Sequence, residues 1–188
     1  MFKKIFLFLR EIIKLAAIAL VIIVPVRYFL IQPFYVKGTS MEPNFHNYEY
    51  LIIDELSYRF EAPQRGEVVV FRYPRDPQEH FIKRIIGLPG EDVQIKDNHV
   101  YIYNKEHPNG FVLNEAYLNP SEVTLANNEN RITLKTDEYF VLGDNRDASQ
   151  DSRFFGPVNK SFITGRVWLR GLPLNKAKVF TKNNLPKY

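Results

Sequence analysis

At 188 residues, with a hydrophobic share of 45%, the chain can bury the core of one ordinary domain and still carry a short extra segment. It has no cysteine, which excludes disulfide bonds, thiolate catalysis and cysteine-ligated metal centres. The net charge of +4 comes from basic residues scattered along the chain instead of gathered in a stripe, so we expect no nucleic-acid partner.

The first part of the chain has the features of a membrane anchor. Residues 12–31 are almost uniformly apolar, and a helix of about 20 residues spans the ~30 Å hydrocarbon core. Cations outnumber acids in residues 1–14, which places this end in the cytoplasm by the positive-inside rule. Residues 32–188 are then predicted to form an extracytoplasmic, β-rich domain. We expect the chain to be a single-pass protein of the cell (plasma) membrane.

Two other interpretations of the apolar segment are weaker. A cleaved signal peptide would need a small-x-small cleavage site after the apolar run, but Arg27, Tyr28, Phe29 and Pro33 occupy that region. A core helix of a soluble protein this uniformly apolar would need to be surrounded by core on all sides.

Beyond the anchor, short apolar or alternating segments recur with turn residues between them, as is typical of strands. The predicted strands are residues 50–54, 67–73, 80–87, 92–96, 100–103, 131–135, 139–142 and 163–169. Asp97-Asn98 predicts a hairpin turn, and residues 74–77 predict a break. No long amphipathic helix is expected, so the fold class is mostly β, a folded antiparallel β-sheet domain. Residues 104–131 are predicted to be a surface insertion and residues 175–188 a frayed end.

Ser40 and Lys83 form a candidate pair of nucleophile and base. Alone, a serine in Gly38-Thr39-Ser40 is most often a turn residue, and a lysine in a strand usually extends from an edge into water. In a strand over residues 80–87, however, Lys83 shares a face with Phe81 and Ile85. Burial there can lower its pKa from ~10.4 to about 8, which a guanidinium does not allow. A neutral amine can then act as a base toward a serine hydroxyl.

Residues 143–153 contain three aspartates, so a calcium loop must be considered. The spacing from Asp147 lacks the glycine and the glutamate that an EF-hand loop requires, and no metal site is expected. A polar network is the better interpretation, with Ser149 hydrogen-bonded to the lysine amine and Asp151 paired with Arg153. A Ser-His-Asp triad is not indicated, since none of the four histidines has a motif context and there is no Gly-x-Ser-x-Gly sequence. No phosphate-binding glycine loop is present, and no cofactor is expected.

Four boxes of sequence behind the apolar segment resemble the bacterial type I signal peptidases (leader peptidases), which are serine/lysine-dyad membrane proteases. The boxes are residues 40–43, 65–71, 83–91 and 143–156, and the resemblance covers nearly the whole chain. It implies that Ser40 is the nucleophile and Lys83 the general base. It also implies that Ser149 orients the lysine, that Asp151 and Arg153 form a supporting ion pair, and that Asp144 and Asn145 have structural roles.

The same resemblance implies the substrate and the partners. It predicts removal of N-terminal signal peptides from exported preproteins, with cleavage after small residues in an Ala-x-Ala-like pattern. The expected surroundings are the lipid bilayer and the secretion translocon. We expect the substrate to add a strand beside the segments that lead into Ser40 and Lys83.

Two positions depart from the family pattern. Some members have a serine that donates its hydroxyl to the oxyanion where this chain has Gly38. Gly38, Thr39 and Met41 are expected near the oxyanion or the substrate, and the Ser40 N–H is one expected donor. The second donor is open between another backbone N–H, the Thr39 hydroxyl and water. Asn44 replaces the usual threonine after Pro43, which we expect to be a local packing change.

Two rival functions remain at this point. A repressor-type self-cleaving protease uses the same dyad, but it would need an internal Ala-Gly-like cleavage site and a DNA-binding domain. An anchored β-domain that binds a partner without catalysis would tolerate replacement of Ser40 or Lys83 by alanine, whereas a peptidase would not.

Overall fold

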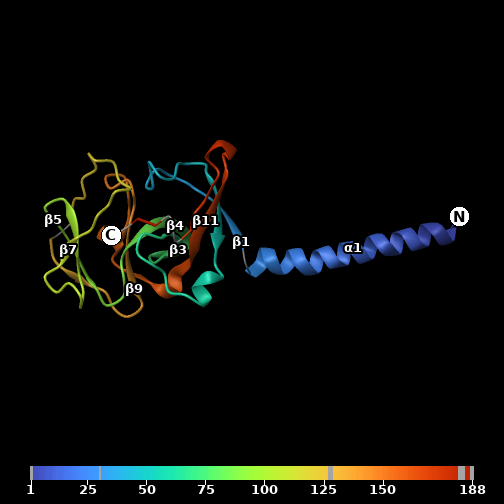
Figure 1. Cartoon of the computed structure of the whole chain (residues 1–188), viewed down its shortest axis with the longest axis horizontal. Helices are drawn as coiled ribbons and strands as arrows, with labels where there is room; N and C mark the ends of the chain where they lie inside the picture. The colour runs from blue at the N-terminus through green and yellow to red at the C-terminus, as the bar shows by residue number, and fades with distance from the viewer. Residues whose placement is uncertain (1, 30, 127–128, 182–184, 187–188) are drawn as a thin grey trace.

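The computed structural model describes residues 2–29, 31–126, 129–181 and 185–186 (Figure 1). Helix α1 (Phe2–Phe29) extends away from a β-rich domain and leads into strand β1 (Ile31–Tyr35). Along α1, large apolar side chains such as Phe6, Leu15 and Leu20 are exposed. Within the described residues, no helix combines the length and the apolar character needed to cross a membrane. The anchor predicted over 12–31 includes residue 30 and the side chains of residues 22 and 24–31, which lie outside the described residues.

The larger sheet has eight strands in the order β1-β2-β11-β3-β4-β9-β10, with β12 paired to β11. All of these pairs are antiparallel, as predicted for a mostly β domain. The strands after β1 are β2 (Tyr50–Asp54), β3 (Val68–Tyr73), β4 (Asp76–Gly87), β9 (Glu138–Leu142), β10 (Val158–Asn159), β11 (Ile163–Leu172) and β12 (Lys178–Val179).

The smaller sheet has four strands in the order β7-β6-β5-β8. Its central hairpin turns at Asp97 and Asn98, whose φ angles of 48° and 63° are those of the predicted two-residue turn. The strands are β5 (Asp92–Lys96), β6 (His99–Tyr103), β7 (Phe111–Val112) and β8 (Ile132–Thr133). The core beneath this sheet also includes Ile86 of β4 and Phe140 of β9, so the two sheets share one packed interface.

Both faces of the larger sheet are covered at β3, which explains its continuous apolar sequence. Val68 and Val70 pack into one core cluster, whereas Val69 and Phe71 on the opposite face pack into another. Successive side chains of a strand point to opposite faces, so a strand buried on both sides needs apolar residues at every position. Lys83 of β4 lies directly opposite Val69 in this buried part of the sheet.

The remaining helices are short. Helix α2 (Ser152–Phe155) is a single turn whose N-cap is Asp151, and the 3-10 helices are η1 (Ser57–Arg59), η2 (Lys160–Phe162) and η3 (Leu174–Lys176).

Two sequence predictions were wrong about regular structure. The break predicted over residues 74–77 is limited to Pro74 and Arg75, because β4 begins at Asp76 and carries Pro77 in its exposed first part. The end predicted to be frayed contains β12, which pairs with β11. Residues 182–184 and 187–188 of that end, and residues 127–128 of the predicted insertion, lie outside the described residues.

Candidate active site

The fold brings Ser40 and Lys83 into contact from elements 43 residues apart. Ser40 lies in the loop between β1 and β2, and Lys83 lies in the middle of β4. The Lys83 Nζ donates a hydrogen bond of 2.7 Å to Ser40 Oγ and another of 2.8 Å to the carbonyl of Ile82. Both partners are neutral oxygens, so the amine has no carboxylate in direct contact among these bonds.

Burial controls the charge of the Lys83 amine. The side chain is 4% exposed, and the amine lies 5.4 Å from the centre of the Phe81 ring. Burial lowers the pKa of Lys83 from 10.5 to about 8, although the charges of Asp151 and Asp144 act in the opposite direction. This pKa agrees with the value of about 8 that the sequence predicted for Lys83. A large fraction of the amine is therefore neutral in mildly alkaline solution.

The loop that carries Ser40, the predicted nucleophile, is called the nucleophile loop here, and it is held by hydrogen bonds from the segment that contains Asn145. The Asn145 backbone N–H donates to the Ser40 carbonyl at 3.1 Å, and its side-chain amide donates to the Thr39 carbonyl at 3.2 Å. Met41 is buried and anchors the loop in the core. The Gly38 N–H donates to Asn47 Oδ1 at 3.1 Å, so it is engaged within the loop and is not available as an oxyanion donor.

Asp151 and Arg153 pair as predicted. The guanidinium donates to both carboxylate oxygens, with an Nε–Oδ1 distance of 2.8 Å and an Nη2–Oδ2 distance of 2.9 Å. Asp151 is fully buried and also accepts a 3.0 Å hydrogen bond from the Gly143 N–H. Its carboxylate therefore fixes both ends of the segment from residue 143 to residue 153.

Ser149 differs from its prediction. Its hydroxyl is buried but has no hydrogen-bond partner among the described residues, so the predicted bond to Lys83 is not formed. The lysine amine is directed instead to Ser40 and to the carbonyl of Ile82 in its own strand. Ser149 packs tightly against Gly143, where any Cβ would collide with Ser149 Oγ and lie 2.5 Å from the Ser40 carbonyl oxygen. Only glycine allows residue 143 to approach the nucleophile loop this closely.

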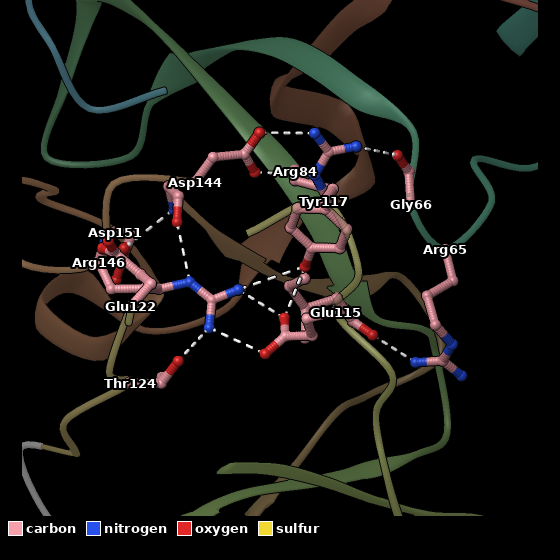
Figure 2. A network of polar contacts seen from close by, with 12 residues as sticks. Arg65, Gly66, Arg84, Glu115, Tyr117, Glu122, Thr124, Asp144, Arg146 and Asp151 are labelled. Atoms are coloured by element: carbon pink, nitrogen blue, oxygen red, sulfur yellow. Dashed lines mark hydrogen bonds and ion pairs between the residues drawn. The ribbon is translucent and has the colours of Figure 1, made fainter. Parts of the chain in front are cut away.

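Asp144 binds the residue next to the lysine (Figure 2). Arg84 lies on the face of β4 opposite Lys83, and its Nε donates to Asp144 Oδ1 at 2.8 Å while its Nη1 donates to the Gly66 carbonyl at 2.9 Å. Asn44 donates to Asp144 Oδ2 at 2.9 Å and to the Tyr117 carbonyl at 2.9 Å. Asn44, which stands where the family usually has threonine, thus connects the nucleophile loop to Asp144 and to the predicted insertion.

A cleft of about 730 Å³ opens beside the two residues. Its walls come mainly from residues 34–40 and 78–83, with Ala148 and Gln150 at one side. β1 is the edge strand of the described sheet, and β4 pairs with β9 only from Arg84 onward. The backbone of β1 is therefore unpaired on the side away from β2, and the backbone of the first part of β4 is unpaired on the side away from β3. An extended peptide can bind to backbone of this kind.

Comparison with known proteins decides the family. A profile of the family described as signal peptidase, peptidase S26, matches residues 9–171 of the chain. The chain belongs to this family. A signal peptidase I of Leptolyngbya laminosa is 35% identical over 177 residues, covering 89% of this chain and 82% of its own length. Signal peptidase I P of Bacillus subtilis subsp. natto is 34% identical over 174 residues, covering 88% and 90%.

Among solved structures, a signal peptidase I from Enterococcus faecalis has 36% sequence identity to this chain. The match covers 57% of this chain and 97% of the Enterococcus faecalis chain, with a TM-score of 0.46. Membership of the S26 family makes this protein a serine endopeptidase.

Sequence reasoning missed the residues of the insertion that reach the site. Arg146 lies within a recognised box but received no role, and its partners Glu115 and Thr124 are 31 and 22 residues away. They lie in the least regular part of the chain, where no periodicity indicates which side chains turn inward. Complementary charge alone does not select a partner at such a separation.

Proposed function

We propose that this peptidase removes N-terminal signal peptides from exported preproteins, with Ser40 as the nucleophile and Lys83 as the general base. The observation that carries the proposal is the 2.7 Å hydrogen bond between Lys83 Nζ and Ser40 Oγ, made by a buried amine whose pKa is lowered to about 8. Family membership and the signal peptidases among its relatives support the substrate class.

The chemistry follows from this contact. Neutral Lys83 accepts the proton of Ser40 as the serine oxygen attacks the scissile carbonyl. The backbone N–H of Ser40 is a donor for the developing oxyanion. When the C–N bond breaks, the Lys83 ammonium returns the proton to the leaving amine. The same amine then takes a proton from water as the water oxygen attacks the acyl-enzyme carbonyl. When the ester bond to Ser40 breaks, the Lys83 ammonium returns that proton to Ser40 Oγ, which restores the hydroxyl and the neutral amine.

Substrate binding is proposed along the two unpaired edges of the cleft. An extended segment beside β1 and the first part of β4 makes backbone hydrogen bonds, while alternate side chains point into the cleft. Apolar residues such as Phe34, Leu51 and Val70 line this space. We propose that they limit the side chains next to the cleaved bond to small residues in an Ala-x-Ala-like pattern.

We place residues 1–11 in the cytoplasm, the apolar part of α1 from residue 12 to residue 29 in the cell membrane, and the domain from β1 onward outside it near the secretion translocon, where substrates emerge. The support is the exposure of large apolar side chains along α1, which extends away from the domain (Figure 1). In alkaline carbonate extraction, the full chain is expected to stay with the membrane pellet. Release into the supernatant would overturn the anchor.

The catalytic assignment is tested with a preprotein and the full chain in detergent. Ser40→Ala and Lys83→Ala are each expected to lower processing by at least ~10³-fold, because either change removes a member of a unit that acts together. Lys105→Ala, at an exposed site of the insertion, is the matched control and is expected to process normally. Processing by either dyad variant at the normal rate would contradict the assignment and favour a domain that only binds its partner.

A further inference from the structure

Glu115, in the predicted insertion, binds the fully buried side chain of Arg146, which belongs to residues 143–153. Glu115 accepts two hydrogen bonds from the Arg146 guanidinium, at 3.0 Å from Nη1 to Oε2 and 2.5 Å from Nη2 to Oε1 (Figure 2). The side chain of Arg146 is 0% exposed and that of Glu115 is 11% exposed. Such a bidentate pair has a fixed geometry as well as a charge.

The rest of the arginine is also surrounded by partners. Nη1 donates to the Thr124 hydroxyl, Nη2 to the Tyr117 hydroxyl at 3.2 Å and Nε to the Gly143 carbonyl at 3.0 Å. The backbone N–H of Arg146 donates to Glu122 at 2.6 Å. Residues 115–124 therefore form a clasp around Arg146, and Glu115 is the carboxylate that neutralises its guanidinium.

The residues on either side of Arg146 touch the nucleophile loop. Asn145 donates to the Ser40 carbonyl, and Gly143, whose carbonyl Arg146 binds, packs against that same oxygen. The Tyr117 ring lies 4.1 Å from the Arg84 guanidinium, next to Lys83 in sequence. A short chain of contacts thus runs from the clasp to the loop that carries Ser40 and to the residue that follows Lys83 in β4.

We propose that Glu115 is a positioning residue, which through Arg146 holds residues 143–153 against Ser40 and Lys83. This inference rests on the proposed function of that dyad. Glu115 itself contacts neither Ser40 nor Lys83 in any described hydrogen bond, so its effect passes through the position of Gly143 and Asn145.

Loss of the clasp has a consequence for acid–base behaviour. Ala148 and Gln150 of residues 143–153 line the same cleft as Lys83, and burial is the larger cause of the low pKa of the Lys83 amine. The same segment carries Asp144 and Asp151, which act in the opposite direction and are paired with Arg84 and Arg153. Other charged or titratable groups that line the cleft are Lys37, Glu79 and His80. Because burial dominates, admitting water to the amine moves its pKa upward.

The experiment measures kcat and KM for a preprotein-derived peptide between pH 6.5 and 10.5, with the full chain in detergent. Glu115→Ala is expected to move the acidic limb of kcat/KM upward by about one pH unit, which costs about tenfold at pH 7. KM should change far less than kcat, and activity should recover toward pH 10. Glu115→Asp, which keeps the charge, should restore part of the loss.

Glu106→Ala is the matched control, because Glu106 is an exposed glutamate of the same insertion. If Glu115→Ala fails to fold, Glu115→Gln keeps the shape and removes the charge, and the same shift is expected. A lower melting temperature with an unchanged pH profile and kcat would overturn the positioning role. If the wild-type chain is active and the Glu115 variants keep its pH profile and kcat, only the positioning role of Glu115 is contradicted. If the wild-type chain does not cleave the peptide at all, both the proposed function and the positioning role are contradicted.

Discussion

Two buried cations, Lys83 of β4 and Arg146 of residues 143–153, have pKa values shifted in opposite directions. Lys83 and Arg146 are 4% and 2% exposed, so both lose most of their hydration. Among the described residues, the Lys83 amine donates its hydrogen bonds to two neutral oxygens, and burial lowers its pKa to about 8. Burial also acts to lower the pKa of Arg146, but the hydrogen bonds and charge of Glu115 outweigh it and the pKa is raised. The direct partner, and not burial alone, decides in which direction the pKa of a buried cation moves. A guanidinium stays charged in either case, whereas an amine can lose its proton.

The largest effect on stability is expected when the ion pair between Arg146 and Glu115 is removed. Arg146→Met leaves the Glu115 carboxylate among buried neighbours without its partner, which should reduce the free energy of unfolding by about 3–5 kcal/mol. Chemical denaturation followed by the fluorescence of Trp168, the single tryptophan, measures the change. A double variant with Glu115→Gln should recover part of the loss. A single variant as stable as the wild type would show that the pair is unimportant.

Replacing Lys83 should have the opposite effect on stability. Since the pKa is 10.5 in the unfolded chain and about 8 in the folded one, the unfolded chain binds more protons between these values and stability rises with pH. Below pH 8 the burial of this group costs up to about 3 kcal/mol. Lys83→Met should therefore raise the free energy of unfolding at pH 7, and the gain should shrink toward pH 10.5. A pH-independent difference would contradict the low pKa.

A smaller effect is expected from the carboxylates near the amine. The charge of Asp151 raises the pKa of Lys83, so Asp151→Asn should lower that pKa further and remove the carboxylate charge that Arg153 binds. The acidic limb of kcat/KM should move down by about one pH unit or less, whatever the loss in amplitude. Asp147→Asn, at an exposed position of the same segment, is the control and should keep the wild-type midpoint.

The lysine half of the comparison could be predicted from the sequence, because it depends on local rules. Alternation along residues 80–87 places Phe81, Lys83 and Ile85 on one face, and the family boxes place Ser40 beside it. The turn at Asp97 and Asn98 was predictable for the same reason, since its residue types determine its geometry.

The arginine half could not be predicted, because its partners lie far away in irregular chain. Nothing in the sequence around Glu115 indicates that it turns inward to bind Arg146. The direction of the Ser149 hydroxyl was also missed, since it depends on which neighbouring oxygens the lysine amine reaches. β12 was missed because two-residue strands carry no period and depend on a partner such as β11.

The most direct test of the account is the titration of the Lys83 amine by NMR. The full chain is labelled with lysine enriched at Cε and Nζ, and the Lys83 signal is assigned by its absence from the spectrum of Lys83→Arg. We predict a midpoint at about pH 8, well below the ~10.4 of a lysine side chain in water. A midpoint of 10 or above would mean that the amine is still an ammonium beside Ser40, and a general base at this position would be contradicted.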